Sequence, residues 1–296
     1  MVRDNSFHWS LPFTHVARFL LGIIFVMFSE SATTTAQTLT GDQLGDGLSI
    51  SVWNPHTQCP DVAPLVAVEI DPERYRFTVH YYQQDGLSDP LDIHQWQERT
   101  GHDLVFNAGL FRENYAYLGL LYGNGRSLGS KRHATWLGLF VAEPAEDRSR
   151  RARVLDLTFD TFDERQPPYR EVAQSLMLLD RTGKVRVRQT GKRAHQTLVA
   201  EQGNGHLLVL KTTQVVSLHA LGECLRNAFP SLRQVMAMDG GSSSDIAVSP
   251  SLRQATAKMA GFHTWIPLLE DSTTHVGLPA VIGISPRRDQ PGAKPR

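Results

Sequence analysis

Two short stretches of the sequence combine residue types that could carry chemistry. In VFNAGLF, Asn107 and Gly109 follow an apolar run, and in VMAMDGGSSSD, Asp239 precedes Gly240 and Gly241. A strand that ends in a polar side chain beside glycine favours binding, because the strand fixes the side chain and the missing Cβ leaves backbone N–H groups accessible. The alternative is an ordinary turn, in which the polar side chain bonds its own backbone. If both strand ends lie on one sheet, we expect them to face one pocket.

The serines after Gly241 raise the question of a serine nucleophile. The stretch GSSSD lacks the G-x-S-x-G spacing that exposes such a serine on a strained turn, and the sequence places no Asp and His partners beside it. A serine nucleophile is therefore disfavoured. The sequence also has no CxxC, no HExxH and no cluster with zinc spacing, so it predicts no metal site and no cofactor.

Several motifs, taken in their order along the chain, resemble the phosphodiester glycosidase domain. They are VFNAGLF, LGLLYGNGR, AQSLML, a helix ending in LRNAFP, VMAMDGGSSS and PAVIGIS. The resemblance covers about residues 103–285 and is most specific at the DGG-S-S motif. The family includes the lysosomal enzyme that removes N-acetylglucosamine from a sugar phosphodiester, and bacterial periplasmic proteins linked to exopolysaccharide. Carried over residue by residue, the family's site implies Asn107, Gly109, Asp239, Gly240, Gly241, Ser242 and Ser243.

The family also has an arginine before a central hairpin, and Arg193 occupies the matching place. The residues after it depart from the family pattern, because AHQT at 194–197 replaces the small and apolar residues and the glycine that usually follow. This difference puts the shape of the arginine loop in doubt. AQSLML also lacks the Gly-Pro that often follows the Gln-Ser pair, which weakens Gln174 and Ser175 as site residues.

Each implied residue has a role that suits its chemistry. Hydrolysis of a glycosyl phosphodiester at the anomeric carbon expels a phosphate monoester with a second pKa of about 6, so strong acid assistance is less necessary. We expect Asp239 to be the reacting carboxylate, Arg193 to bind the phosphate through its planar fork, and Asn107 to orient a sugar hydroxyl or the attacking water. The amides of Gly240 to Ser243 would add an anion-binding concavity. The usual scheme needs a second carboxylate, for which three residues are candidates without priority: Asp180, Glu201 and Asp245.

Two further side chains could contact a sugar phosphate. His195 could bind a phosphate oxygen, although a lone histidine beside a hairpin is more often a surface or packing residue. Trp136 could stack on a sugar ring, although its place in the apolar run WLGLF favours the core.

Hydrophobic patterns and turn residues predict the elements that hold these strand ends. Helices are expected at 88–101 and 217–230, hairpins at 117–128 and 197–212, and a solvated charged loop at 145–153. Further strands are expected at 48–53, 64–70, 74–82, 103–106, 136–144, 185–190, 231–238 and 278–285. The predicted fold class is α+β, a single domain with a mainly antiparallel sheet and a few packed helices.

Four segments follow from this pattern. They are a signal peptide (1–36), N-terminal strands and a helix that pack on the core (37–102), the phosphodiester-glycosidase-like domain (103–285) and a disordered tail (286–296). Arg3 and Arg18 precede the apolar run at 19–28, which is shorter than the roughly 20 residues of a membrane span. Export with cleavage before Gln37 is therefore favoured, while Glu30 leaves an uncleaved anchor open.

Cysteines and charge limit the environment and the partners. Export would place the chain in an oxidising compartment, which permits a bridge between Cys59 and Cys224, and two separate thiols are the alternative. The chain has 30 basic and 30 acidic residues and no long basic run, so nucleic acid is not expected as a partner.

Two functions agree with these observations. The first is a periplasmic or secreted hydrolase that cleaves the bond between the anomeric carbon and oxygen of glycosyl phosphodiesters. The second is a non-catalytic glycan- or phosphate-binding protein of the same fold, acting in envelope polysaccharide assembly. Both predict a sugar phosphodiester or an envelope glycan as partner and no stable membrane span after signal cleavage, and both leave the oligomeric state open. A hydrolase should show the guanidinium of Arg193 converging with Asp239.

Overall fold

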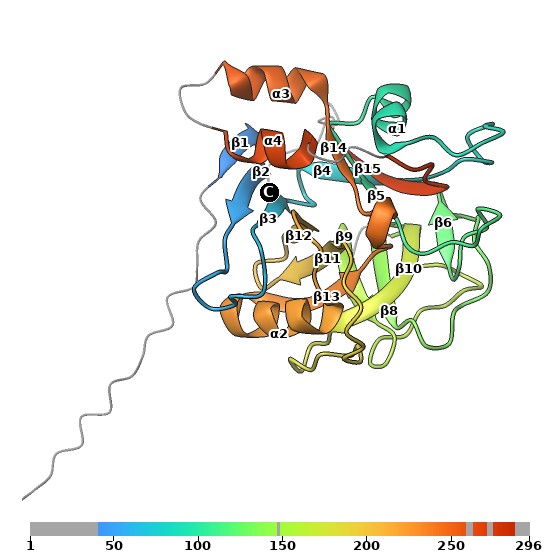
Figure 1. Cartoon of the computed structure of the whole chain (residues 1–296). Helices are drawn as coiled ribbons and strands as arrows, with labels where there is room; N and C mark the ends of the chain where they lie inside the picture. The colour runs from blue at the N-terminus through green and yellow to red at the C-terminus, as the bar shows by residue number, and fades with distance from the viewer. Residues whose placement is uncertain (1–40, 147–148, 259–262, 271–274, 288–296) are drawn as a thin grey trace, which may run out of the picture. The chain divides into compact units, whose positions relative to one another are not determined.

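The computed structural model describes residues 41–146, 149–258, 263–270 and 275–287 (Figure 1). The predicted signal peptide lies outside these residues, as does the predicted tail from residue 288 onward. Within the described part of the chain, no helix is long and apolar enough to cross a membrane.

Most strands belong to one large antiparallel sheet. Its eleven strands among the described residues are β1 (Asp42–Gly45), β2 (Leu48–Trp53), β3 (Leu65–Ile70), β6 (Leu121–Gly123), β7 (Arg126–Ser127), β8 (Gly138–Pro144), β9 (Ala152–Asp156), β10 (Tyr169–Leu179), β11 (Thr197–Gln202), β12 (Leu207–Thr212) and β13 (Leu232–Ala237). They follow the order β1-β2-β3-β12-β11-β13-β10-β6-β7, and β8 pairs with both β10 and β9. The N-terminal strands β2 and β3 thus share a sheet with the strand that leads to Asp239.

A second sheet contains four described strands in the order β14 (Ile246–Val248), β5 (Leu104–Asn107), β15 (Ala280–Pro286) and β4 (Tyr75–Tyr81). Every strand pair in both sheets is antiparallel. With few helices beside them, these sheets confirm the predicted α+β class.

The helices begin and end where local chemistry satisfies their backbone groups. The described helices are α1 (Ile93–Thr100), α2 (Leu218–Ala228), α3 (Pro250–Ala257), α4 (Trp265–Glu270) and the 3-10 turn η1 (Gly241–Ser243). Helix α1 begins later than predicted because Asp92 and Gln95 form a capping box, and it ends at Gly101 in a left-handed conformation. Ser217 caps α2 as the sequence predicts.

The described residues form three apolar core clusters, and the two largest lie on opposite faces of the large sheet. Between the two sheets, residues of β2, β3 and β12 pack against residues of β4, β5 and β15, such as Ile50, Val209, Phe77 and Ile282. On the opposite face, Leu221 and Leu225 of α2 pack against the sheet. Because β11 and β12 are covered on both faces, all of their residues are buried, which explains their continuous apolar runs.

The predicted hairpins are both present, whereas the strand predicted at 185–190 is wrong. Val185 forms only an isolated bridge with Leu179. The carboxylate of Asp180 accepts hydrogen bonds from Thr182, Lys184 and Arg186. These bonds hold a compact turn instead of a strand ladder.

Candidate functional site

The two predicted strand ends meet, but they come from different sheets. Asn107 ends β5 in the smaller sheet, and Asp239 follows β13 in the larger one. The backbone N–H of Asp239 donates to the carbonyl of Ala108 at 3.1 Å, and Nδ2 of Asn107 donates to the carbonyl of Asp239 at 2.8 Å. The two ends do not share a sheet, and it is the packing of the two sheets against each other that brings them together. The contact itself lies where the sequence predicts a site.

Asn107 holds backbone groups on both sides of this junction. Its Nδ2 also lies 3.2 Å from the carbonyl of Ala108, and its Oδ1 accepts a hydrogen bond from the backbone N–H of Asp245 at 3.1 Å. The side chain is almost completely buried. Asn107 therefore fixes the positions of Asp239 and Asp245, and its predicted contact with a substrate stays a prediction.

Asp239 is a half-buried carboxylate with a raised pKa. The side chain is half-buried, and its Oδ1 accepts a hydrogen bond from the N–H of Gly240 at 3.0 Å. Burial raises the pKa of Asp239 to about 6, and hydrogen bonds from the Ser243 hydroxyl and the Gly240 amide oppose this change. A carboxyl group with a pKa near neutrality can exchange a proton with a substrate or water at physiological pH.

The glycines and serines after Asp239 form a tight turn. Gly241 has φ of +71°, and its N–H donates to the carbonyl of His195 at 2.8 Å. Ser242 is exposed and Ser243 is buried. The amides of Gly240 and Gly241 already donate hydrogen bonds within the protein. Of the four amides predicted to bind an anion, only those of Ser242 and Ser243 therefore remain candidates.

Gly109 allows close packing beneath the junction. Its N–H donates to the hydroxyl of Tyr117 at 3.0 Å, and that hydroxyl donates to the carbonyl of Gln174 at 2.9 Å. A Cβ at residue 109 would lie 2.3 Å from the Tyr117 hydroxyl oxygen. Burial raises the pKa of Tyr117. The role of Gly109 in the structure is thus to let the strand end approach Tyr117.

Gln174 of β10 and Trp136, which precedes β8, lie next to this packing. Gln174 is buried, and its amide bonds the N–H groups of Leu120 and His133 and the carbonyls of His133 and Trp136. Trp136 is half-buried and stacks on His133 with ring centroids 3.9 Å apart. The expectation that Trp136 lies in the core is wrong, because the chain enters β8 only at Gly138.

Arg193 lies on an exposed loop before β11. Its Nη2 donates to the carbonyl of Val215 at 3.0 Å, and no hydrogen bond or ion pair joins it to Asp239 among the described residues. His195, two residues later, is half-buried and contacts the site through its carbonyl, which accepts the N–H of Gly241. The arginine loop therefore borders the turn after Asp239, with the guanidinium directed to the loop that contains Val215.

The three candidates for a second carboxylate lie in different environments. Asp180 holds the turn after β10, as described above. Glu201 is buried beneath Arg150, Arg153 and Arg233, at 2.7, 3.8 and 3.7 Å. The predicted solvated loop thus supplies two arginines to a buried acid, which the sequence analysis did not expect. Only Asp245 contacts Asn107, so it is the acidic candidate that belongs to the site.

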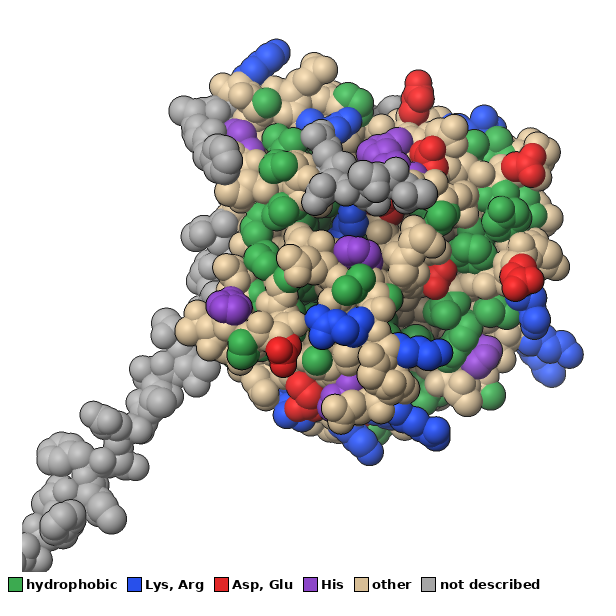
Figure 2. Space-filling model, viewed as in Figure 1, with side chains coloured by type: hydrophobic (Ala, Val, Ile, Leu, Met, Phe, Trp, Pro, Cys, Tyr) green, Lys and Arg blue, Asp and Glu red, His purple; other side chains and the backbone are tan. Residues whose placement is uncertain are grey.

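Two residues beside Asp245 were missed by the sequence analysis. Lys211 Nζ lies 3.3 Å from Oδ1 of Asp245, and His275 Nδ1 lies 2.6 Å from its Oδ2. A lysine inside the apolar run LLVLKT could have indicated a buried charge, whereas nothing in the sequence around His275 connects it to Asp245. Figure 2 shows histidine, basic and acidic side chains gathered around the middle of the face over β5, β10 and β14 of Figure 1.

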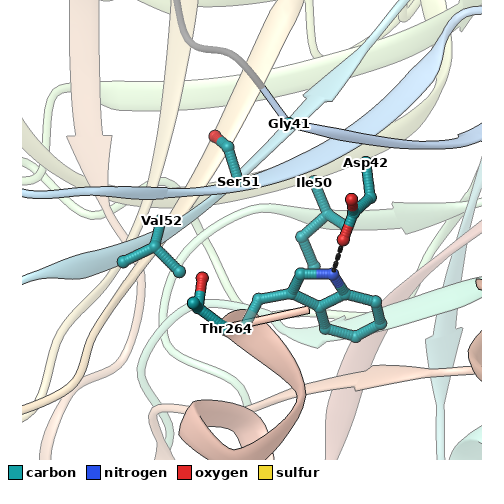
Figure 3. A pocket seen from close by; sticks show the side chains of 7 residues that line it. Gly41, Asp42, Ile50, Ser51, Val52 and Thr264 are labelled. Carbon is teal, nitrogen blue, oxygen red and sulfur yellow. Dashed lines mark hydrogen bonds between the residues drawn. The ribbon is translucent and has the colours of Figure 1, made fainter. Parts of the chain in front are cut away.

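A separate pocket lies between β1, β2 and α4 (Figure 3). It has a volume of about 310 Å³, and its lining includes Asp42 and Trp265. Oδ2 of Asp42 accepts a hydrogen bond from Nε1 of Trp265 at 2.6 Å and lies 2.7 Å from Nδ1 of His263. None of the predicted site residues lines this pocket, and its carboxylate is held by protein groups. The junction at Asp239 is therefore the better candidate site.

Comparison with known proteins gives a fold but no family. The sequence shows no significant match to a family profile or to a curated protein. A hypothetical protein from Synechocystis has a similar structure, with a TM-score of 0.56 and 10% sequence identity. The match covers 86% of this chain but only 64% of the length of that protein. The catalytic domain of zebrafish N-acetylglucosamine-1-phosphodiester alpha-N-acetylglucosaminidase, auto-inhibited by its pro-peptide, is similar at 13% identity with a TM-score of 0.53, over 85% of this chain and 87% of that domain. The chain shares its fold with these proteins.

Proposed function

We propose that the protein is a hydrolase that cleaves the bond between the anomeric carbon and the oxygen of glycosyl phosphodiesters. One observation carries this proposal: a half-buried carboxylate with a pKa of about 6, Asp239, lies where the ends of β5 and β13 meet. The fold shared with the zebrafish glycosidase supports the substrate class, because that enzyme is named for a sugar phosphodiester.

Asp239 is the reacting carboxylate in this proposal, and Asn107 is the residue that positions it. Gly241 leaves open space at this turn, because no heavy atom lies within 4 Å of the place that its Cβ would take, whereas Gly240 packs closely against Gln196 and the carbonyl of His195. Arg193 remains the proposed phosphate clamp at the rim, since its loop borders Gly241 through the carbonyl of His195 and its guanidinium is exposed. A bidentate guanidinium suits a phosphodiester better than a point charge does.

Export to the periplasm or the outside of the cell is part of the proposal. Cys59 and Cys224 form a disulfide with a Cα–Cα distance of 5.7 Å, which answers the question left open by the sequence. Disulfides persist mainly in oxidising compartments. The bridge therefore supports export independently of the N-terminal sequence.

One observation favours the second candidate function, a non-catalytic glycan- or phosphate-binding protein in envelope polysaccharide assembly. The guanidinium of Arg193 bonds Val215 rather than Asp239 in this structure. A binding protein needs no convergence of these two groups, whereas a hydrolase needs a substrate to draw them together.

The deciding experiment measures sugar release from a panel of glycosyl phosphodiesters in water enriched in oxygen-18. A glycosidase places the heavy oxygen on the sugar, whereas attack at phosphorus places it on the phosphate. We expect label on the sugar, and we expect Asp239→Asn to abolish release. Asp46→Asn is the matched control, because Asp46 is an exposed carboxylate paired with Arg74. No release by the folded protein on any substrate would support the binding protein instead.

A further inference from the structure

A buried ion pair lies next to the Asp239 site. Lys211 at the end of β12 and Asp245 after η1 expose only 8% and 5% of their side chains, and Nζ lies 3.3 Å from Oδ1. Oδ1 of Asp245 also accepts the N–H of Ile246 at 2.9 Å. Removing two charges from water costs several kcal/mol per ion unless the geometry compensates, so such pairs are poor stabilising devices. A buried charged pair next to a half-buried carboxylate is instead a frequent feature of functional sites.

Asn107 connects this pair to the reacting carboxylate. Its Oδ1 accepts the backbone N–H of Asp245, and its Nδ2 donates to the carbonyl of Asp239. One amide side chain thus fixes the backbone at both aspartates. Any group held by the side chain of Asp245 is therefore held in a constant relation to Asp239.

The side chain of Asp245 holds an imidazole. Its Oδ2 lies 2.6 Å from Nδ1 of His275, whose side chain is 23% exposed. With Nδ1 directed to a carboxylate, the second nitrogen, Nε2, is the one left to act on a ligand, and it has no hydrogen-bond partner among the residues that the structure describes. The ring of His94 packs edge-on against His275 at 4.6 Å and limits its rotation.

Asp245 itself is a poor second carboxylate for a glycosidase. Both of its oxygens are occupied, Oδ1 by Nζ of Lys211 and the N–H of Ile246, and Oδ2 by Nδ1 of His275. Among the described residues that contact Asn107, Asp245 thus offers Asp239 no free second carboxylate, but it does hold an oriented imidazole.

We propose that His275, oriented by Asp245 and Lys211, is the second proton-transfer group of the site and protonates the departing phosphate. This inference rests on the proposed function. Water forms the new bond to the anomeric carbon and gives a proton to Asp239. The bond from that carbon to the phosphate oxygen breaks, its electron pair stays on the oxygen, and that oxygen takes the proton of Nε2. The products are the free sugar and a phosphate monoester, and solvent returns the two groups to their starting protonation states.

His206 offers a matched control for His275. Its Nδ1 lies 2.9 Å from Oε1 of Glu69, so it too is a histidine oriented by a carboxylate. It precedes β12, whereas Lys211 lies near the end of that strand. Five residues of extended chain separate them by roughly 16 Å, which removes His206 from the site.

The test compares His275→Gln with His206→Gln on a glycosyl phosphodiester and on the corresponding glycosyl fluoride. The leaving group of the glycosyl fluoride is a fluoride ion, so this substrate has no phosphate oxygen that His275 could protonate. Because a phosphate monoester is already a good leaving group, we expect His275→Gln to lower kcat/KM for the phosphodiester by about 10-fold or more, and to change the fluoride reaction by less than about threefold. His206→Gln should match the wild type on both substrates, and Asp239→Asn should lose both activities. Equal losses on the two substrates, or no loss, would overturn the role of His275 while leaving the hydrolase proposal intact.

A second measurement separates failure of this inference from failure of the proposed function. Inorganic phosphate is added while the imidazole signals of the wild-type protein are followed by NMR, which requires no turnover. We expect phosphate to shift the ring signals of His275 and not those of His206. If the wild type hydrolyses nothing and phosphate still shifts His275, the hydrolase proposal fails and the contact between His275 and phosphate stands. If phosphate leaves the His275 signals unchanged, the inference fails.

Discussion

At the scale of single residues, burial of Asp239 gives it a pKa suited to proton transfer but lowers the stability of the folded protein at neutral pH. Burial raises the pKa of Asp239 from 3.8 to about 6, so the folded protein binds this proton more tightly than the unfolded chain does. The stabilising contribution is therefore complete at acidic pH and is lost as the pH rises from about 4 to about 6. At neutral pH the protein bears the cost of an ionised, partly desolvated carboxylate.

Asp239→Asn should therefore stabilise the protein at neutral pH. Two pKa units correspond to about 3 kcal/mol at most, and we expect the free energy of unfolding to increase by about 1–3 kcal/mol at pH 7.5. At pH 4 the difference from the wild type should be much smaller, because the wild-type carboxyl is then largely protonated. Chemical denaturation at both pH values measures the effect. A variant that is less stable than the wild type at pH 7.5 would contradict the assignment.

The same pKa predicts the pH dependence of the proposed reaction. If ionised Asp239 accepts a proton from water, kcat/KM should fall as the pH drops below about 6. Initial rates measured from pH 4.5 to 8 on a glycosyl phosphodiester test this expectation. An acid limb that stays near pH 4 would show that the reacting carboxyl has an ordinary pKa.

Arg193 is tested best by a substitution that keeps its charge. Arg193→Lys should lower kcat/KM for phosphodiesters by about 10-fold or more and leave neutral glycosides nearly unchanged, because a single ammonium cannot replace a bidentate fork. Arg188→Lys is the control, since Arg188 is an exposed arginine five residues earlier in the same segment. Similar losses on both substrate types would remove the phosphate role of Arg193.

At the scale of elements, Gly109 lies two residues after the end of β5, where the chain packs closely against β10. A Cβ at this position would lie 2.5 Å from the backbone carbonyl of Gln174, in addition to its clash with Tyr117, and backbone atoms cannot rotate away. Gly109→Ala should therefore lower the free energy of unfolding by about 1–3 kcal/mol and displace the junction at Asp239. Gly203→Ala is the control, because the nearest atom to its Cβ would be 3.6 Å away. Thermal unfolding and activity are measured on both variants. A Gly109→Ala protein with the stability and activity of the wild type would contradict the close packing at Gly109.

The elements themselves were largely predictable, because their signals are local. Glycine at 203 and 205 marks the hairpin of β11 and β12, and Ser217 marks the start of α2. Which strands pair is a non-local property, so the placement of β5 and β13 in separate sheets could not be read from either strand. For the same reason the sequence indicated Asn107 and Asp239 as site residues but did not reveal that Asn107 bonds backbone groups of Asp239 and Asp245.

His275 shows the limit of local reasoning most clearly. It lies 30 residues after Asp245, and no periodic pattern around it indicates a site. Its proposed role depends on one contact, between its Nδ1 and the carboxylate of Asp245, which only the folded chain brings about. A buried lysine such as Lys211 leaves a stronger signal, because a charge within a strand that is apolar on both faces requires a partner.

At the scale of the whole molecule, the disulfide links the N-terminal part of the chain to the face opposite the smaller sheet. Cys59 lies in the loop between β2 and β3, and Cys224 lies on α2 with a sequence separation of 165 residues. Both side chains belong to the apolar cluster between α2 and the large sheet. The bridge therefore ties α2 to the loop between β2 and β3. It lies on the α2 side of the large sheet, whereas the smaller sheet, which contains β5, packs on the other side.

Removing this bridge should change stability far more than activity. A cross-link across so long a segment restricts the unfolded chain, and its loss typically costs about 2–5 kcal/mol. The double variant Cys59→Ser/Cys224→Ser should therefore unfold at a markedly lower temperature, while its kcat/KM at 25 °C stays close to that of the wild type because neither cysteine contacts the Asp239 site. Thermal unfolding with and without a reducing agent provides the control. The reductant should lower the Tm of the wild type towards that of the double variant and leave the variant unchanged, whereas equal Tm values in all four samples would show that the bridge adds nothing to the stability of the fold.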